Sequence, residues 1–293
     1  MVRIKAGPGL RRRGLLALAL LVALTCACSR LSIGWRLAPY WLKHEAVRWL
    51  DAGVDERGAL DRDVDAYLHR LALTLAPQAA GWSRHLAKLV AAGRDKEAVD
   101  SLFDGGILLW RGAKELGVDP AADWLARRPQ ERAKALRRQF DKELRRDQGR
   151  PAFSKEAADR AKRLREGLAD WIGDLREEQQ DLVVDFAAHA AYPDEAMAAD
   201  RRAREQAILA ALAASADRRA LGDLLRRWWL DPEADRKKAC VKAVQEYRLG
   251  LRATLCRLAG TLSAAQRDRL VRRLNALAQD LDAISRRATL EGD

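Results

Sequence analysis

Two cysteines near the N-terminus, Cys26 and Cys28, are the residues whose setting indicates a chemical reaction. Residues 1–13 carry five basic side chains and no acidic one, and residues 14–24 are uninterruptedly apolar. This pattern is typical of an export signal, and the apolar stretch is too short to span a bilayer comfortably. A thiol directly after a small residue, as Cys28 follows Ala27, can receive a diacylglyceryl group before the signal is cleaved.

The segment therefore predicts a lipoprotein signal peptide over residues 1–27 and lipidation, with acyl chains such as palmitate, at Cys28. Cys26 is the alternative acceptor, although Thr25 would then stand at the cleavage junction, where Ala27 fits better. A secretory peptide without lipid and an uncleaved anchor are the other interpretations. The residue after Cys28 is Ser29 and not an aspartate, which by analogy with other lipoproteins favours the outer membrane. We therefore expect a protein that is anchored in the cell envelope and faces the periplasm.

The charge pattern argues against nucleic acid as a partner. The whole chain has a net charge of +12, but removal of residues 1–27 takes away five basic residues and no acid, which leaves +7. Along the rest, arginines alternate with acids, as in the run Arg267-Asp268-Arg269, which is typical of solvated helix faces with ion pairs. We expect the membrane as a partner through the lipid, a possible protein partner in the envelope and no nucleic acid. The oligomeric state stays open.

Beyond Cys28, no pattern of residues indicates catalysis or metal binding. The four histidines form no H-E-x-x-H motif, and no two of them are three or four positions apart; they are His44, His69, His85 and His189. The sequence also lacks a G-x-S-x-G elbow and a phosphate-binding loop. We therefore expect no enzyme, no cofactor and no metal, and an unrecognised enzyme is the third choice among functions.

The apolar residues recur at helical spacing nearly everywhere, which predicts an all-α fold. Apolar residues three or four apart run from Leu60 to Leu75, and an alternation of fours and threes runs from Leu270 to Ala288. The second series is typical of the seam between packed helices. We expect antiparallel helical hairpins in one elongated bundle or in two helical subdomains.

Prolines and glycines indicate where these helices start and stop. Asp119-Pro120 and Asp231-Pro232 each place a capping side chain before a proline of a first helical turn. Pro77, Pro129 and Pro193 predict further helix starts. Gly149-Arg150-Pro151 is the best candidate for a boundary between two parts of the chain. The predicted parts are a first helix within 28–56, a subdomain over 57–148 and a subdomain over 152–293.

Two turns in the second half resemble one another. Gly173, Leu175 and Gln179 have the spacing of Gly260, Leu262 and Gln266. Each glycine is expected to end a helix with a positive φ, and each leucine to pack under the turn. Ser263 and Gln266 predict a capping box, whereas Asp174 with Glu177 is the expected cap of the first copy. Both units are expected to form helical hairpins, the second over residues 233–288.

Cys240 and Cys256 are sixteen positions apart in one predicted helix. Their backbones would be about 24 Å apart, which is too far for a disulfide within one chain. Whether they pair between chains stays open.

Tryptophans are frequent in the first predicted helix, which contains Trp35, Trp41 and Trp49. Because an indole ring favours the headgroup layer of a membrane, this helix either lies at the membrane interface or forms the first core helix.

The sequence resembles a family of proteobacterial lipoproteins (domain of unknown function 6279) in five features. They are Cys28-Ser29-Arg30-Leu31, the Trp-rich first helix, the Leu-x-x-x-Gln turns, Trp228-Trp229-Leu230-Asp231-Pro232 and the turn from Thr261 to Arg267. The resemblance spans most of the mature chain and is best after Lys155. It implies an exported, lipid-anchored helical protein and provides no catalytic residues. A weaker similarity is to the Leu-Thr-x-x-Gln motif of periplasmic stress chaperones, whose helices form cradles.

The sequence thus favours a lipid-anchored, non-catalytic helical scaffold or binding module in the periplasm. The alternative is a chaperone-like cradle that binds unfolded or amphipathic clients.

Overall fold

The computed structural model describes residues 30–148, 157–190 and 194–292. Within these residues the chain forms ten helices and no strand, which confirms the all-α prediction. The helices are α2 (Arg30–Leu50), α3 (Val54–Ala91), α4 (Asp95–Arg127), α5 (Pro129–Gln148), α6 (Ala157–Ile172), α7 (Glu177–His189), α8 (Asp194–Ala213), α9 (Arg218–Leu230), α10 (Lys238–Gly260) and α11 (Ala264–Gly292).

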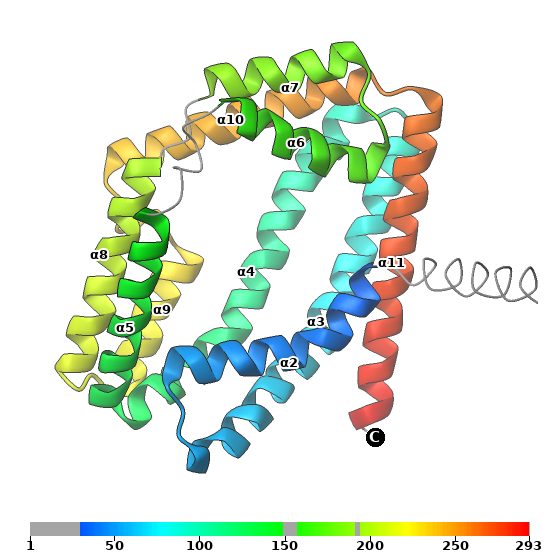
Figure 1. The fold of residues 1–293 in the computed structure, drawn as a ribbon. Coiled ribbons are helices and arrows are strands. Elements are labelled where there is room, and N and C mark those ends of the chain that lie inside the picture. The colour runs from blue at the N-terminus through cyan, green and yellow to red at the C-terminus, as the bar shows by residue number, and fades with distance from the viewer. Residues whose placement is uncertain (1–29, 149–156, 191–193, 293) are drawn as a thin grey trace, which may run out of the picture.

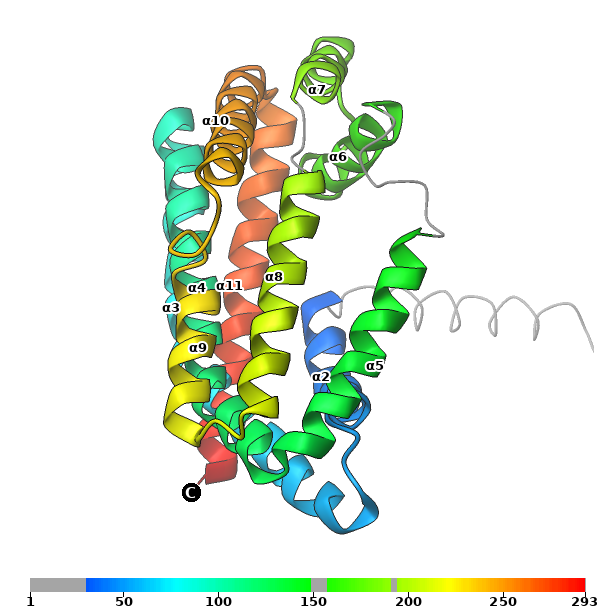
Figure 2. The ribbon, with the colours of Figure 1, turned by 90° about the vertical axis from the view of Figure 1, so that its left-hand side faces the viewer.

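The helices are arranged as the sides of a frame (Figure 1). In that view α6, α7 and α10 lie along the top, α5, α8 and α9 along the left, α3 and α11 along the right, and α2 along the bottom. Helix α4 crosses between the top and the lower left and packs on α3, α9 and α10. The view from the side places α3, α4 and α9 in one layer and α2 and α5 in another (Figure 2).

The most extensive contact between two helices is that of α3 with α11. Small buried residues follow α3 at spacings of three and four, and they allow the two backbones to approach closely; they are Ala72, Ala76, Ala80, Ser83 and Ala87. The Ser83 hydroxyl donates to the Leu274 carbonyl oxygen of α11 at 2.8 Å. The apolar series from Leu270 to Ala288 is thus a packing seam, as expected, and its partner is α3.

Helix α10 does not pair with α11 in the hairpin expected over residues 233–288. It packs on α4 and α7, whereas α11 turns away and follows α3 (Figure 1). The long apolar seam of α11 packs instead against the small residues of α3.

The contact between α3 and α4 depends on two glycines. A Cβ atom at Gly105 would lie 2.1 Å from Nε1 of Trp82, and one at Gly112 would lie 2.9 Å from a methyl carbon of Leu75. Trp82 fills the first gap and donates from Nε1 to the Ser101 carbonyl oxygen at 2.9 Å. These glycines keep α4 close to α3, so that its opposite face is turned toward the interior of the frame.

Two of the expected helix starts are wrong, because Pro77 and Pro120 lie inside α3 and α4. An interior proline costs a helix about 3 kcal/mol. Burial of the neighbouring residues outweighs that cost: Ala76 packs against α11, and Val118 belongs to a core shared with α9. Pro129 does begin α5.

At Asp231-Pro232 the helix ends rather than begins. Asp231 is the C-cap of α9, and a turn over residues 232–237 leads to α10. Pro193 lies outside the described residues.

The boundary expected at 149–151 also lies outside the described residues. The helices before and after it pack on one another: α11 on α3, α9 on α4 and α8 on α5. One buried cluster contains Val118 from α4, Leu136 from α5, Leu212 from α8 and Leu221 from α9. The described residues before and after this boundary therefore share a buried cluster.

The two related turns meet at the corner between α7 and α11. Gly173 has a φ of +84°, as expected, but the positive φ expected at Gly260 is wrong. Gly260 is the last residue of α10, and Thr261 closes that helix with its backbone N–H and its hydroxyl, which both donate to the Leu258 carbonyl oxygen. At this helix end a threonine hydroxyl bonds a terminal carbonyl oxygen, whereas the other turn uses a left-handed glycine.

The capping box expected at Ser263 and Gln266 is present, with bonds of 3.1 and 3.2 Å in the two directions. In the first copy, Gln179 accepts from the Arg176 backbone N–H at 3.0 Å, so the cap expected from Asp174 with Glu177 is replaced by this bond. Both glutamines are buried and bond to each other through both amides, at 2.9 and 3.0 Å.

We predict that Gln179→Ala and Gln266→Ala each lower the free energy of unfolding by about 1–3 kcal/mol, because each removes the two bonds of the amide pair and leaves the partner amide buried with part of its hydrogen bonding lost. Together they should lose less than the sum of the single losses, with a coupling of about 0.5–3 kcal/mol in urea unfolding. Gln245→Ala, at an exposed glutamine, is the control. Strictly additive losses would contradict the amide pair.

Candidate functional site

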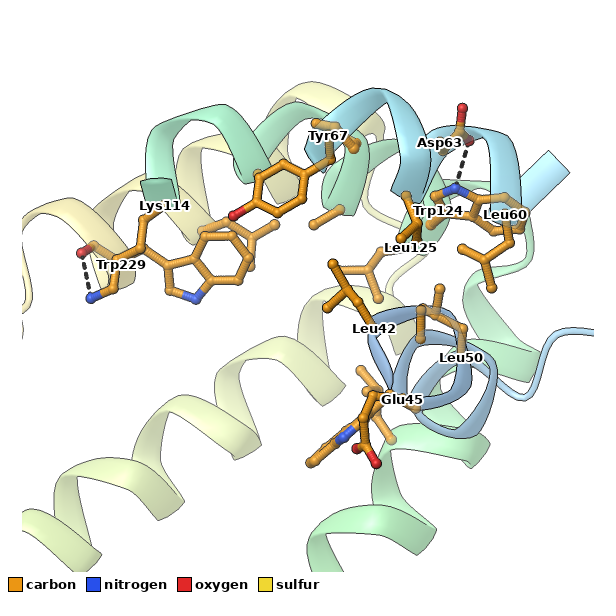
Figure 3. Close-up of a pocket in the computed structure, with 18 of the residues that line it drawn as sticks. Leu42, Glu45, Leu50, Leu60, Asp63, Tyr67, Lys114, Trp124, Leu125 and Trp229 are labelled. Atoms are coloured by element: carbon orange, nitrogen blue, oxygen red, sulfur yellow. Dashed lines mark hydrogen bonds between the residues drawn. The ribbon is translucent and has the colours of Figure 1, made fainter. Parts of the chain in front are cut away.

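A large cavity lies between the two layers at the bottom and left of the frame and has a volume of about 740 Å³. Its walls come from α2, α3, α4, α5, α8 and α9 (Figure 3). We call it the main pocket. Its size is typical of sites for small organic ligands. Seven aromatic side chains line it: Trp49, Tyr67, Trp110, Trp124, Phe140, Trp228 and Trp229.

Helix α4 contributes one continuous face to the main pocket. Trp110, Ala113, Gly117, Ala121 and Trp124 recur at spacings of three and four on that face. Gly117 carries no side chain where a Cβ atom would come within 3.6 Å of both Tyr67 and Trp229. Small residues between the indoles therefore leave the space open.

The two carboxylates of the main pocket are already paired. Asp63 accepts from Nε1 of Trp124 at 2.8 Å and lies 3.7 Å from Arg127. Glu45 pairs with Arg48 on the same helix, and its carboxylate points away from Leu42 (Figure 3).

The Tyr67 hydroxyl is also engaged, since it donates to the Ala113 carbonyl oxygen at 3.1 Å. Burial raises the pKa of this phenol, so it stays protonated. These polar groups of the lining therefore have partners within the protein, and the rest of the wall is apolar except at one place.

That place is Lys114. Its Nζ donates to the Trp229 carbonyl oxygen at 3.2 Å and lies 5.0 Å from the centroid of the Trp110 ring. Burial lowers the pKa of Lys114, and the nearby charges of Arg204 and Arg236 lower it further. Lys114 makes no ion pair within the described part of the chain.

Arg204 and Arg236 share a single carboxylate. Oδ2 of Asp200 lies 2.7 Å from Arg204 and 2.9 Å from Arg236. Arg204 also donates to the Trp228 carbonyl oxygen at 3.2 Å, so this group adjoins the pocket wall. Lys114 and these three side chains carry a net charge of +2.

A buried arginine fixes the opposite end of the main pocket. The Arg132 side chain is fully buried and donates to the carbonyl oxygens of Leu50 and Trp124 and to the carboxylate of Glu56. These partners lie at the end of α2, near the end of α4 and at the start of α3. Arg132 thus joins four helices below the leucines of the pocket. The pKa of Glu56 is lowered, chiefly by its hydrogen bond from Arg132.

A second pocket of about 330 Å³ lies at the top of the frame, between α3, α4, α6, α10 and α11. Between the two pockets, the middle of α4 exposes large apolar side chains. Leu102 lines the second pocket, Trp110 lines the main pocket, and Ile107 lies between them in sequence. Trp110 is 65% exposed and Ile107 is 52% exposed. The interior face of α4 thus carries apolar side chains from one pocket to the other.

Two of the three tryptophans of the first helix pack inside the protein, and the third is exposed. Trp35 packs against α3 and α11, and Trp49 lines the main pocket with Phe140, its ring centroid 5.8 Å away. Trp41 is 63% exposed, and Tyr40 beside it is exposed too. Helix α2 therefore has an inner face that packs and an apolar outer face that does not.

The remaining sequence-predicted residues do not gather at the main pocket. Cys28 and Cys26 lie outside the described residues. Cys240 and Cys256 are free thiols on α10, and Gln179 and Gln266 stabilise the corner described above.

Among the described residues, no three His, Cys, Asp or Glu side chains form a possible metal site. None of the described helices is long and apolar enough to cross a membrane.

Sequence reasoning missed the main pocket and its residues Lys114 and Arg132. In an amphipathic helical pattern, a lysine or arginine is normally assigned to the solvent-exposed face. Trp228 and Trp229 both line the main pocket and both pack against the core cluster that contains Leu221, so their helical positions do not distinguish a pocket residue from a core residue.

The structure is therefore that of an all-α protein with a large, open and mainly apolar pocket. The chain belongs to a family of unknown function, DUF6279, whose model matches residues 48–234. Most of the main pocket, from Trp49 to Trp229, lies within that stretch. No curated protein and no solved structure matches the chain.

We predict that Glu56→Gln lowers the free energy of unfolding at pH 7 by about 3 kcal/mol, because it leaves the buried Arg132 without a counter-charge. The pKa of Glu56 is lower in the folded protein than in the unfolded chain. Its stabilisation is therefore complete above the unfolded pKa of about 4.3 and is lost as the pH falls through the folded pKa. The gap between wild type and variant should narrow below roughly pH 4 in urea unfolding.

Glu131→Gln is the matched control, since Glu131 pairs with Arg128 on the surface. It should change stability by less than about 0.5 kcal/mol. Equal losses from the two variants would contradict a structural role for the buried pair.

Proposed function

We propose that this protein is a non-catalytic binding module of the cell envelope, anchored by lipid at Cys28, which holds an apolar ligand in the main pocket. The observation that carries the proposal is an apolar cavity of about 740 Å³ lined by seven aromatic side chains. Such cavities are the usual sites for small-molecule ligands, and large apolar surfaces rarely stay open on a monomer without a use.

The direction of α2 supports the anchoring part of the proposal. The helix begins at Arg30, two residues after Cys28, so a lipid at that cysteine would hold this end of the molecule at the membrane. Its outer face exposes Ile33, Leu37, Tyr40 and Trp41, which fit the headgroup layer. Its inner face lines the main pocket.

The second candidate is a chaperone-like cradle. It is favoured by the exposed apolar residues in the middle of α4, which could bind an unfolded or amphipathic client. The glutamine turns lend it no support, because both glutamines are consumed in a buried structural pair.

We predict that the chain from residue 29 onward binds the uncharged dye Nile red at one site with a fluorescence increase. Ala113→Phe should weaken this binding about tenfold or more, because the ring fills the main pocket. Ala203→Phe, at an exposed alanine of α8, should not. All three proteins should give cooperative melts, since a molten sample also binds such dyes. No binding, or equal binding by both variants, would exclude the pocket as a ligand site.

We predict that Cys28→Ser abolishes metabolic labelling with a palmitate analogue and releases the protein from membranes, because firm attachment needs several acyl chains. Cys26→Ser should retain both properties. Labelling that persists in Cys28→Ser and disappears in Cys26→Ser would move the anchor to Cys26.

A further inference from the structure

The main pocket has distinct ends. Figure 3 shows Lys114 beside the backbone of Trp229 at one end, whereas Leu42, Leu50 and Leu60 lie toward the other. Indoles and small residues of α4 occupy the length between them. Lys114 is thus the polar side chain of the lining that keeps unused donors, whereas Asp63, Glu45 and Tyr67 are engaged within the protein and the rest of the lining is apolar, as suits a long amphiphile.

The polar end has the charge to bind an anion. Lys114 has three N–H donors, and one of them is used by the Trp229 carbonyl oxygen. Arg204 and Arg236 stand nearby with one carboxylate between them, which leaves the group with a net charge of +2. A carboxylate on the ligand would pair with Lys114 and offset this charge.

The apolar length favours an acyl chain over a polypeptide. A peptide carries an N–H and a C=O group at each residue, and burial without partners costs free energy for each. Tyr67, Asp63 and Glu45 are already engaged within the protein. An acyl chain has no polar groups to satisfy beyond its head.

We propose that the main pocket binds a long-chain fatty acid, with the carboxylate at Lys114 and the hydrocarbon chain running between α2 and α4 toward Leu42 and Leu60. This inference rests on the proposed function and specifies the class of its ligand. Helix α2 carries exposed apolar side chains on its outer face and lines the main pocket with its inner face. A fatty acid from the membrane would therefore reach the pocket along this helix.

The test uses the full chain in its membrane and a palmitate probe that carries a diazirine near the end of its chain. After irradiation, crosslinked peptides should map to the leucine end of the main pocket. Unlabelled palmitate should compete with the probe, whereas hexadecanol and hexadecyltrimethylammonium, of equal chain length, should compete at least about tenfold less well.

Lys114→Met should lower crosslinking at limiting probe about tenfold, because the anion loses its partner. Lys142→Met, at an exposed lysine of α5, is the matched control and should not. Thermal unfolding of the purified variants shows that both are folded. A photoreactive phenylalanine analogue in place of Phe140, which lines the main pocket, shows what occupies the pocket in the cell, and the expected product is a mass increase the size of a fatty acid.

Equal competition by all three amphiphiles, with no effect of Lys114→Met, would overturn the choice of an anion but leave an apolar binding module standing. Crosslinks outside the pocket would overturn the inference, and the absence of Nile red binding would overturn the proposed function as well. Capture of a polypeptide at position 140, including the chain's own residues 14–24, would also overturn it.

Discussion

The position of four helices depends on one buried cation. Arg132 is excluded from solvent, and a charge in that position is tolerated only if it is paired and hydrogen-bonded. Its partners are Glu56 and the carbonyl oxygens of Leu50 and Trp124, which lie on three different helices. The guanidinium therefore sets where α2 ends, where α3 begins and how α4 passes them, and these helices are walls of the main pocket.

The turn beside Arg132 carries backbone strain that this junction must hold. Asp51, between α2 and α3, has a φ of +49°, a left-handed conformation that side chains other than glycine adopt at a cost. Arg138 pairs with its carboxylate, and Ala52 donates from its backbone to Val47. The strained turn lets α2 fold back over α3, so that Leu42 and Trp49 face into the pocket.

Small residues and large ones have separate uses in this frame. Alanines and glycines on α3 and α4 bring the backbones of one layer together, whereas indoles and leucines line the space between the layers. The glutamine pair at the corner of α7 and α11 fixes the top of the frame.

Local patterns predicted what depends on near neighbours. The helical periodicity, the seam from Leu270 to Ala288 and the capping box at Ser263 all follow from spacings of three and four residues. The expectations at Pro77 and Pro120 failed because tertiary packing outweighs the cost of an interior proline. At Gly260, a threonine hydroxyl took over the role that glycine has in the other turn.

The main pocket could not be predicted in this way, because it joins residues far apart in the chain. Trp49, Trp110 and Trp228 come from three helices, and each fits an ordinary core position in its own helix. Arg132 sits in a run of charged residues, and nothing near it in sequence marks it as buried. Only the arrangement of α2, α4, α5 and α9 around the main pocket reveals what these residues do together.

The most direct measurement is a crystal structure of the protein grown with palmitate brominated at the end of its chain, using the anomalous scattering of bromine. A bromine peak among Leu42, Leu50 and Leu60, with carboxylate density beside Lys114, is the predicted result. Bromine bound only on the outer face of α2, or a main pocket filled by side chains, would contradict an internal lipid site.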